Sequence, residues 1–329
     1  MKVLVTGSAG HLGEALVRSL RSDGFDVVGL DLKASAFTDF TGSITCRETV
    51  REAVAGCDSI LHTATLHKPH VGTHTRQDFV DINISGTLNL LEEAVNSNCQ
   101  SFIYTSTTST FGDAMQPQAG EAAVWVTEEL RPQPKNIYGV TKVAAEDLCQ
   151  LFHRNTGLPC LVLKTSRFFP EQDDTKDRRD GFADANLKVN ELLNRRIDIA
   201  DIVSAHTMAM TNAARIGFEK LILTATTPFS QSDAANLAVN MPAVLQNYIP
   251  DYVEQFNRKN WRMFQTLDRV YDNSKARRIL GWEPKYNFKQ AIERIAQDKD
   301  YRSELARQIG SKGYHDEAFV DGPFPVTGF

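Results

Sequence analysis

Tyr138 and Lys142, in the stretch NIYGVTK, form a pair of side chains that could move a proton. If this stretch is helical, residues four apart project from one face, about 6 Å apart at their Cβ atoms. A lysine ammonium beside a phenol stabilises the phenolate, so we expect Lys142 to lower the pKa of Tyr138 from about 10 and make it a general base. The same spacing is common on solvated helix faces, so the pair needs support from elsewhere in the chain.

A glycine-rich stretch near the start, VLVTGSAGHLG, supplies that support. Gly7, Gly10 and Gly13 follow a short apolar run and precede a helical pattern. There, glycines allow a tight turn, bring backbone N–H groups and the helix N-terminus against a pyrophosphate, and let the helix pack closely on a sheet. Asp31 ends the next apolar run, about 20 residues further along the chain. A carboxylate at this position can accept hydrogen bonds from both ribose hydroxyls of a dinucleotide and would repel a 2′-phosphate. The pattern predicts an NAD site, with a plain tight turn as the alternative.

Alternating apolar runs and helical patterns position these residues. Such alternation is typical of a doubly wound parallel sheet covered by helices, an α/β Rossmann fold. We expect strands at 2–7, 26–32, 59–65, 101–107, 159–167 and 220–226, and helices at 12–24, 80–98, 138–157 and 200–218. The NAD-binding domain then comprises residues 1–165 and 201–227. Residues 166–200 and 228–329, rich in charge, proline and aromatic side chains, are expected to form a smaller α+β substrate-binding lobe.

Composition limits the partners. The chain has 329 residues, a net charge of −5 and 42% hydrophobic residues, which fits a globular protein and argues against nucleic acid or an anionic membrane as the partner. Its five cysteines are widely spaced, without the paired spacing of a zinc site or redox dithiol. With no signal peptide or apolar run long enough to span a bilayer, the sequence indicates a cytoplasmic protein.

Six ordered motifs carry a resemblance to a known family. They are TGSAGHLG, SILHTAT, NISGTLNLLEEA, FIYTSTTSTFG, NIYGVTK and NSKARRILGWEP. The chain resembles the extended short-chain dehydrogenases/reductases of the NAD-dependent epimerase/dehydratase type, similar to UDP-glucose 4-epimerases. The resemblance implies a Rossmann domain, NAD as cofactor, a sugar or nucleotide-sugar substrate, and a homodimer formed by the helices that begin near Asp78 and Tyr138.

The resemblance also implies roles for single residues. Thr107 would hydrogen-bond the reacting hydroxyl or carbonyl, Tyr138 would accept and donate the proton, and Lys142 would hold the nicotinamide ribose and tune Tyr138. The expected cofactor contacts are Gly7, Gly10, His11, Leu12, Gly13, Asp31, Ala64, Asn83, Tyr138 and Lys142. The expected substrate contacts are His67, Thr107, Thr108, Arg167 and Asn186. His11 is expected to be an exposed spacer near the phosphates.

The residues around Thr107 limit the reactions that the protein could catalyse. Similar 4,6-dehydratases carry an Asp-Glu pair after the catalytic threonine, whereas Thr108 and Ser109 stand here. This leaves 4-epimerisation of a sugar or nucleotide sugar as the leading hypothesis. The alternative is a dehydrogenase or reductase of a smaller sugar or hydroxy compound, and a non-catalytic NAD sensor is a third possibility.

Three departures from the family pattern bear on the substrate. Only about ten residues separate the segment of Asn186 from that of Asp198, where family members have a longer stretch that clasps the nucleotide. Arg167 replaces an asparagine of the sugar pocket, and an arginine there could clamp a carboxylate or phosphate. Ser43 stands where the family usually has an aspartate facing adenine.

Two other features of the sequence each have a functional and a structural interpretation. His62, His67, His70 and His74 crowd one segment, but Pro69 disturbs any helix that would align them, so we expect no metal site and place His67 at the substrate. The charge run from Lys176 to Asp180 could be a lid, although a solvated loop is the more common outcome.

Overall fold

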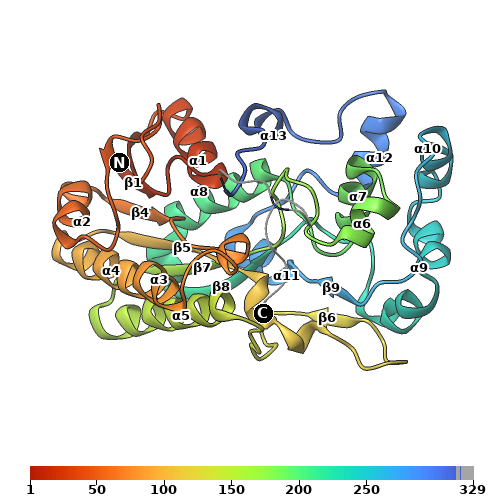
Figure 1. Ribbon diagram of the computed structural model, residues 1–329, viewed down its shortest axis with the longest axis horizontal. Helices are drawn as coiled ribbons and strands as arrows, with labels where there is room; N and C mark the ends of the chain where they lie inside the picture. The colour runs from red at the N-terminus through yellow and green to blue at the C-terminus, as the bar shows by residue number, and fades with distance from the viewer. Residues whose placement is uncertain (316–318, 320–329) are drawn as a thin grey trace.

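A seven-stranded parallel sheet forms the centre of the protein. The computed structural model describes residues 1–315 and 319 (Figure 1). The strands lie in the order β3-β2-β1-β4-β5-β7-β8. Their bounds are β1 Lys2–Thr6, β2 Asp26–Asp31, β3 Phe40–Thr41, β4 Ser59–His62, β5 Ser101–Thr107, β7 Cys160–Thr165 and β8 Phe218–Leu223. Because the chain winds outward in opposite directions from β1 and β4, a crevice opens at the carboxyl ends of these strands. The predicted doubly wound α/β fold is confirmed.

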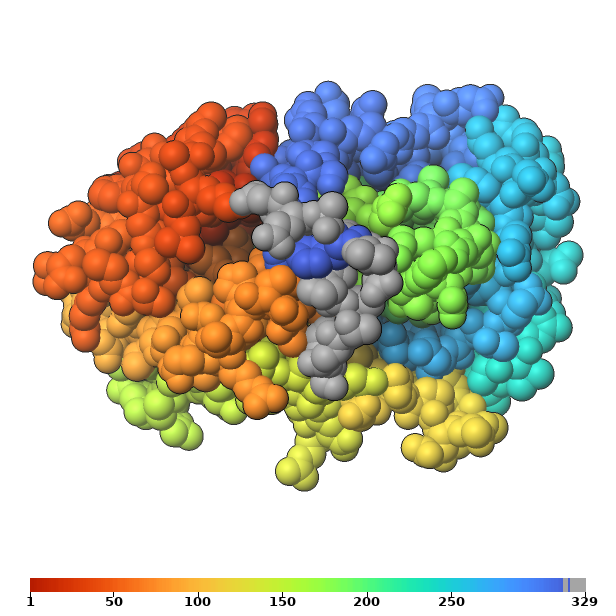
Figure 2. Space-filling model, in the orientation of Figure 1, coloured from red at the N-terminus to blue at the C-terminus, as the bar shows by residue number. Residues whose placement is uncertain are grey.

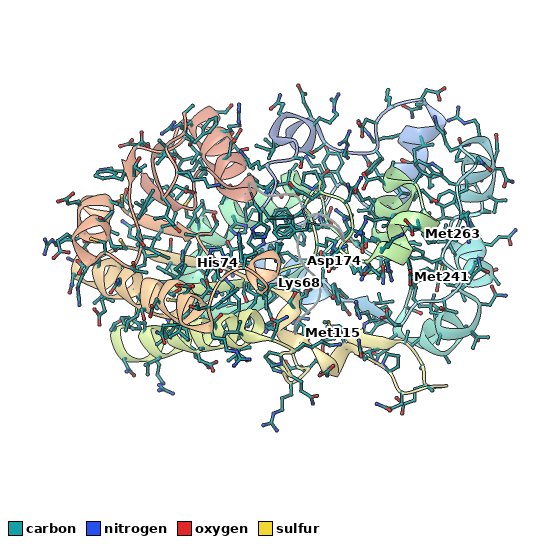
Figure 3. The ribbon with its side chains drawn as sticks, viewed as in Figure 1. Lys68, His74, Met115, Asp174, Met241 and Met263 are labelled. Atoms are coloured by element: carbon teal, nitrogen blue, oxygen red, sulfur yellow. The ribbon has the colours of Figure 1, made fainter. Side chains whose placement is uncertain are left out.

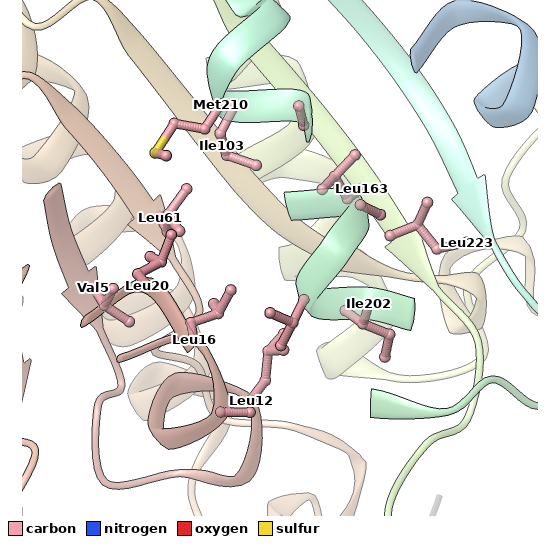
Figure 4. Packing of buried hydrophobic residues seen from close by; sticks show 14 of the residues in the cluster. Val5, Leu12, Leu16, Leu20, Leu61, Ile103, Leu163, Ile202, Met210 and Leu223 are labelled. Atoms are coloured by element: carbon pink, nitrogen blue, oxygen red, sulfur yellow. The ribbon is translucent and has the colours of Figure 1, made fainter. Parts of the chain in front are cut away.

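Helices cover both faces of this sheet, because residues on the strands alternate between two apolar cores. On one face, Val3 and Val5 pack against α1 (His11–Ser22) and α8 (Ile199–Ile216), as Figure 4 shows for Leu12, Leu16, Leu20, Ile202 and Met210. On the other face, Leu4 packs with residues of α2 (Arg47–Val54), α4 (Gly86–Asn96) and α5 (Ile137–Thr156). The two cores hold the strand ends, and with them the crevice, in place.

The helix expected at 80–98 has a more complex form. It consists of α3 (Arg76–Val80), a π-helical turn (Asp81–Ser85) and α4, which run on without a break. A π-helical turn accommodates an extra residue and often lies at a functional site. Here it carries Asn83, whose contacts are described below.

A smaller lobe packs at the carboxyl edge of the sheet. It contains α6 (Lys176–Gly181), α7 (Asp184–Glu191), α9 (Ala234–Tyr248), α10 (Tyr252–Arg258) and α12 (Phe288–Ala296), shown at the right of Figure 1. Its own apolar core includes Val189, Leu237, Phe256 and Phe288. A two-stranded parallel sheet, β6 (Val124–Val126) and β9 (Arg269–Tyr271), joins this lobe to residues from the first half of the chain.

The packing differs from the expected boundary at residue 228. After β9 the chain returns to the Rossmann domain, where α11 (Ser274–Leu280) packs on α8 and β8, and α13 (Glu304–Ile309) packs on α1 and α8. Trp282 falls in the range expected to form the small lobe, but it is buried in the core of α1 and α8, where its indole N–H donates to Ser204 Oγ at 3.0 Å. Part of the expected range, residues 316–318 and 320–329, lies outside the described residues. None of the described helices is long and apolar enough to cross a membrane.

Candidate active site

A deep cleft lies at the crevice of the sheet and brings together most of the residues singled out in the sequence. Its lining includes Gly7, Gly10, His11, Leu12, Gly13, Asp31, Ala64, His67, Thr107, Thr108, Tyr138, Lys142 and Arg167. It runs from the end of β2, past the glycine turn, to the ends of β5 and β7. Asn83 and Asn186 are not part of this lining.

The glycine turn forms the middle of the cleft. Gly7 has a φ of +72°, a left-handed conformation that suits glycine. A Cβ on Gly13 would lie 1.9 Å from the carbonyl oxygen of Gly7, so only glycine allows α1 to begin this close to β1. Gly10 caps α1 with no side-chain hydrogen bond, which leaves the N–H groups of the first helical turn available to the cleft. These N–H groups and the positive end of the helix fit a pyrophosphate.

Asp31 and Ser43 mark one end of the cleft. The Asp31 carboxylate accepts from the backbone N–H of Ala9 at 3.0 Å and from that of Lys33 at 2.8 Å, which fixes it at the end of β2. Leu32, Gly42 and Ser43 line the cleft beside it. Spare lone pairs of the carboxylate fit the two hydroxyls of an adenosine ribose, and no lysine or arginine is among the described residues that line this end of the cleft, where it would attract a 2′-phosphate. The residues present therefore fit NAD.

Tyr138 and Lys142 lie at the other end of the cleft, beside Thr107 at the end of β5. Burial raises the pKa of Tyr138 to about 12, although a hydrogen bond with the Thr107 side chain opposes that rise. Lys142 Nζ donates to the backbone oxygen of Thr105 at 2.7 Å and lies 4.1 Å from the centre of the Tyr104 ring. Burial lowers the pKa of Lys142 to about 7. The expectation that Lys142 lowers the pKa of Tyr138 is therefore wrong for this state, because burial outweighs it and the ammonium points to Thr105.

The two predicted asparagines hold backbone segments instead of lining the cleft. Asn83 Oδ1 accepts from Leu66 N at 2.9 Å, while Asn83 Nδ2 donates to Leu66 O at 2.9 Å and to Thr141 Oγ1 at 3.0 Å. Asn186 in the same way accepts from the backbone N–H of Arg262 and donates to its carbonyl. With these amides occupied, neither residue contacts the cleft. Asn83 instead fixes the loop that follows β4, which forms one wall.

Arg167 lies at the substrate end, already surrounded by carboxylates. Its guanidinium bonds Asp173 and, at 2.6 Å, Asp174, and it lies 3.6 Å from Glu191. Lys68, from the opposite wall, also pairs with Asp174, and Figure 3 shows these two side chains meeting near the middle of the molecule. The expected free arginine clamp is therefore an ion-pair network in this state, and it ties the charged loop after β7 to the cleft.

Glu171 is a site residue that the sequence analysis missed. Its carboxylate lies in the cleft, where His11 Nε2 is 2.8 Å from Oε1 and Ser311 Oγ donates to the same oxygen at 2.8 Å. His11, expected to be an exposed spacer, is 6% exposed because Glu171 and the ring of Phe169 cover it. No local pattern signals this contact, since 160 residues separate the two partners.

Several other polar side chains complete the substrate end. Arg195, Arg269, Ser166 and Tyr271 all line the cleft. The Ser166 hydroxyl is buried and has no hydrogen-bond partner among the described residues, so it is available to a ligand. The position of Ser166, at the carboxyl end of a buried strand, was the signal that could have identified it.

Three of the four crowded histidines, His62, His67 and His70, have separate roles. His62 is buried between Thr6 and Thr87, its ring nitrogens 2.8 and 2.9 Å from their hydroxyls, and burial lowers its pKa well below the usual value. His67 lines the cleft, while His70 Nδ1 accepts from the His67 backbone N–H at 3.1 Å. Within residues 1–315 and 319, no three His, Cys, Asp or Glu side chains are placed to hold a metal ion.

With this geometry in place, comparison with known proteins identifies the family. Residues 3–220 match the model of the NAD dependent epimerase/dehydratase family. The chain belongs to this family. The protein is therefore an enzyme, and its cofactor is NAD, as the glycine turn and Asp31 indicate. The resemblance stated from the motifs is confirmed.

Individual relatives share between a quarter and a third of their aligned residues with this chain. The chain is 26% identical to a UDP-glucose 4-epimerase of Rhizobium meliloti, over 88% of this chain and 94% of that protein. It is 31% identical to an uncharacterized protein of Sinorhizobium fredii, of which it covers 39%, and 28% identical to a 3-beta-hydroxysteroid dehydrogenase of Mycolicibacterium neoaurum, of which it covers 50%.

Solved structures confirm the fold. A UDP-glucuronic acid 4-epimerase from Bacillus cereus in complex with NAD has a TM-score of 0.64 at 20% identity, covering 97% of this chain and 99% of that one. A short-chain dehydrogenase/reductase superfamily protein from Agrobacterium tumefaciens with bound NAD gives the same score and identity over 94% and 97%.

Proposed function

We propose that the protein is an NAD-dependent epimerase that inverts a secondary alcohol of a sugar, with 4-epimerisation of a nucleotide sugar as its reaction. The observation that carries the proposal is the contact between Tyr138 and Thr107 at the end of a cleft that fits NAD. Thr108 and Ser109 offer no acid or base for elimination of water, which argues against a dehydratase.

A second hollow supports a nucleotide on the substrate. Arg178, Phe182, Arg262 and Phe264 line it, and Arg195 lines both this hollow and the main cleft. The Arg178 guanidinium lies 5.4 Å from the Phe264 ring centre, and that of Arg262 lies 5.5 Å from Phe182. Aromatic faces and arginines together suit a base and phosphates, and this hollow replaces the longer clasp that the sequence lacks.

The chain's own residues would act in a simple sequence. Thr107 and Tyr138 hydrogen-bond the reacting hydroxyl, and the Tyr138 oxygen takes its proton as the carbinol is oxidised. Bound NAD supplies the hydride acceptor and donor. Tyr138 then returns the proton when the ketone is reduced from its other face. Lys142, buried beside Thr105, would hold the ribose next to the reacting carbon.

A dehydrogenase of a smaller acidic compound is the second candidate. The observation in its favour is the set of cations at the substrate end, where Lys68, Arg167, Arg195, Arg196 and Arg269 line the cleft. If Asp173 and Asp174 withdrew, Lys68 and Arg167 would lose these partners and could bind a carboxylate or phosphate without any nucleotide. This reaction would accumulate NADH in proportion to product, whereas epimerisation would not.

Substitution of Tyr138 by phenylalanine tests the proposed function. Loss of a positioned acid–base group typically costs 10²–10⁴-fold in turnover, and we expect Tyr138→Phe to lose at least 10²-fold while NAD still binds. Turnover is followed as interconversion of UDP-glucose and UDP-galactose, with Tyr248→Phe as the control, because Tyr248 contacts Asp233 on the small lobe outside the cleft. Unchanged turnover in Tyr138→Phe would overturn the acid–base role.

We further propose a cytoplasmic homodimer built on α5. Val140 and Leu151 of this helix are exposed apolar residues, 50% and 38% accessible, and their spacing of eleven places them on one face. The five cysteines are free thiols, which suits a reducing compartment. Sedimentation equilibrium of wild type and Val140→Glu is the test of the dimer.

A further inference from the structure

The segment Ser311–His315 follows α13 and crosses the cleft; we call it the strap. Figure 2 shows its dark-blue surface at the centre of one face, between the orange and the green parts of the chain. Tyr314 of the strap lines the cleft together with residues of the glycine turn. The strap therefore lies beside the place where the cofactor's phosphates fit.

Glu171 holds the strap through several hydrogen bonds. Its Oε1 accepts from Ser311 Oγ at 2.8 Å, from Lys312 N at 3.0 Å and from Gly313 N at 3.1 Å, and its Oε2 accepts from the Tyr314 hydroxyl at 3.3 Å. Burial alone would raise the pKa of Glu171, but His11 and these donors lower it to about 2. The carboxylate is thus charged at neutral pH, and this single group accepts hydrogen bonds from four residues of the strap.

Further contacts bind the strap to two other walls of the cleft. Lys312 Nζ pairs with Glu14 Oε2 on α1 at 2.5 Å, and His315 Nε2 lies 2.9 Å from the carbonyl oxygen of Pro69. The Tyr314 ring packs edge-on against His67 at 5.0 Å and against Phe169 at 5.7 Å between ring centres. The strap thus joins α1, the loop after β4 and the loop after β7, which are three walls of the cleft.

We propose that Glu171 is a positioning residue that latches the strap over the cleft, so that NAD cannot leave until these contacts break. The inference rests on the NAD site of the proposed function and deepens it. A cofactor held in place between turnovers suits a reaction that returns the hydride to the same substrate. It is a disadvantage for a dehydrogenase, which must exchange NADH for NAD in every cycle.

Release of radiolabelled NAD into an excess of unlabelled NAD tests the latch without any substrate. We expect Glu171→Gln to release NAD at least tenfold faster than wild type, because the charged acceptor of the strap is lost. Glu219→Gln is the matched control, since Glu219 pairs with Lys275 on the surface, outside the cleft, and its release rate should stay within twofold of wild type. Release from Glu171→Gln within twofold of wild type would overturn the proposal.

A second variant and a second readout keep the test independent of folding. Truncation after Gly310 removes the strap together with residues 316–329 and leaves α13 intact. This variant should also release NAD at least tenfold faster, and it decides the test if Glu171→Gln fails to fold. Trypsin cleavage after Lys312, read by mass spectrometry, should be at least tenfold faster in Glu171→Gln than in wild type, and equal rates would contradict the latch. Loss of turnover in Tyr138→Phe concerns the reaction alone, so failure of the proposed function and failure of the latch give different results.

Discussion

Substitution of Glu191 by glutamine should strongly destabilise the fold, because this carboxylate is the centre of an arginine cluster. Glu191 ends α7 and is completely buried. Arg195 Nη2 donates to its Oε1 at 2.6 Å, and Arg196 Nε donates to its Oε2 at 2.8 Å. Arg167 and Arg178 lie within 3.6 and 3.9 Å. Burial alone would raise the pKa of Glu191, but the surrounding arginines hold it well below the usual range.

The size of the loss follows from these contacts. A glutamine keeps one acceptor oxygen but turns an NH₂ group toward an arginine N–H, and the cluster loses its negative charge. Two charge-assisted hydrogen bonds contribute about 1.5–3 kcal/mol each, and breaking a buried ion pair from one side typically costs about 3–5 kcal/mol. We therefore expect Glu191→Gln to lower the free energy of unfolding by about 3–5 kcal/mol.

Urea unfolding at pH 7 measures this difference. Asp180→Asn is the control, because Asp180 and its partner Lys176 are 60% and 69% exposed, and such pairs contribute less than about 1 kcal/mol. The pKa of Glu191 is lower in the folded protein, so its stabilising contribution is present above the unfolded value of 4.5 and is lost as pH falls. The gap between wild type and Glu191→Gln should therefore narrow in acid. A loss below about 1 kcal/mol at neutral pH would refute the account, given the range for a broken buried pair.

Two further predictions concern the glycine turn and a buried carboxyl. Gly13→Ala places a Cβ 1.9 Å from the Gly7 carbonyl oxygen, so α1 must shift and the affinity for NAD, measured by calorimetry, should fall at least tenfold. Gly181→Ala is the control, because a Cβ at Gly181 would contact nothing within 4 Å, and this variant should bind NAD as wild type does. Equal NAD affinities of the two variants would contradict the close approach of α1 to β1. Asp201 accepts from the backbone N–H groups of Lys285 and Tyr286, yet burial raises its pKa to about 7. A raised folded pKa contributes stability below the unfolded value of 3.8 that is lost as pH rises through 7. Wild type should therefore lose stability relative to Asp201→Asn between pH 4 and 7, and a gap in urea midpoints that stays constant would refute this.

The sequence predicted what local pattern controls. The strands that end at Thr6, Asp31 and Thr107 are short, apolar and rich in β-branched residues. Glycines at intervals of three after such a strand are typical of a turn that binds a dinucleotide. These features are set by neighbours in the chain, so motif and periodicity were enough to predict the parallel sheet, the cofactor and the residues of the cleft around Tyr138.

Long-range contacts and competition for hydrogen bonds account for what was missed. Asn83 and Asn186 were assigned to the cofactor and the substrate through the family resemblance, but backbone groups of Leu66 and Arg262 occupy their amides. The pKa of Tyr138 depends on burial, which spacing to Lys142 does not reveal. Glu171 stands in a charged run like any solvated loop, and only the folded chain brings His11 to it.

The return of the chain to its own beginning also affects how the protein is made. α13 packs on α1 and α8, and α11 packs on α8, so helices from distant parts of the sequence cover one another. During synthesis the part of α1 that α13 covers therefore stays exposed until α13 has left the ribosome, whereas the strands and α8 cover the rest of its apolar face earlier. The strap arrives later still, so the Rossmann domain cannot mature as an independent unit ahead of the small lobe. Completion of the cofactor cleft thus requires the synthesis of α13 and the strap.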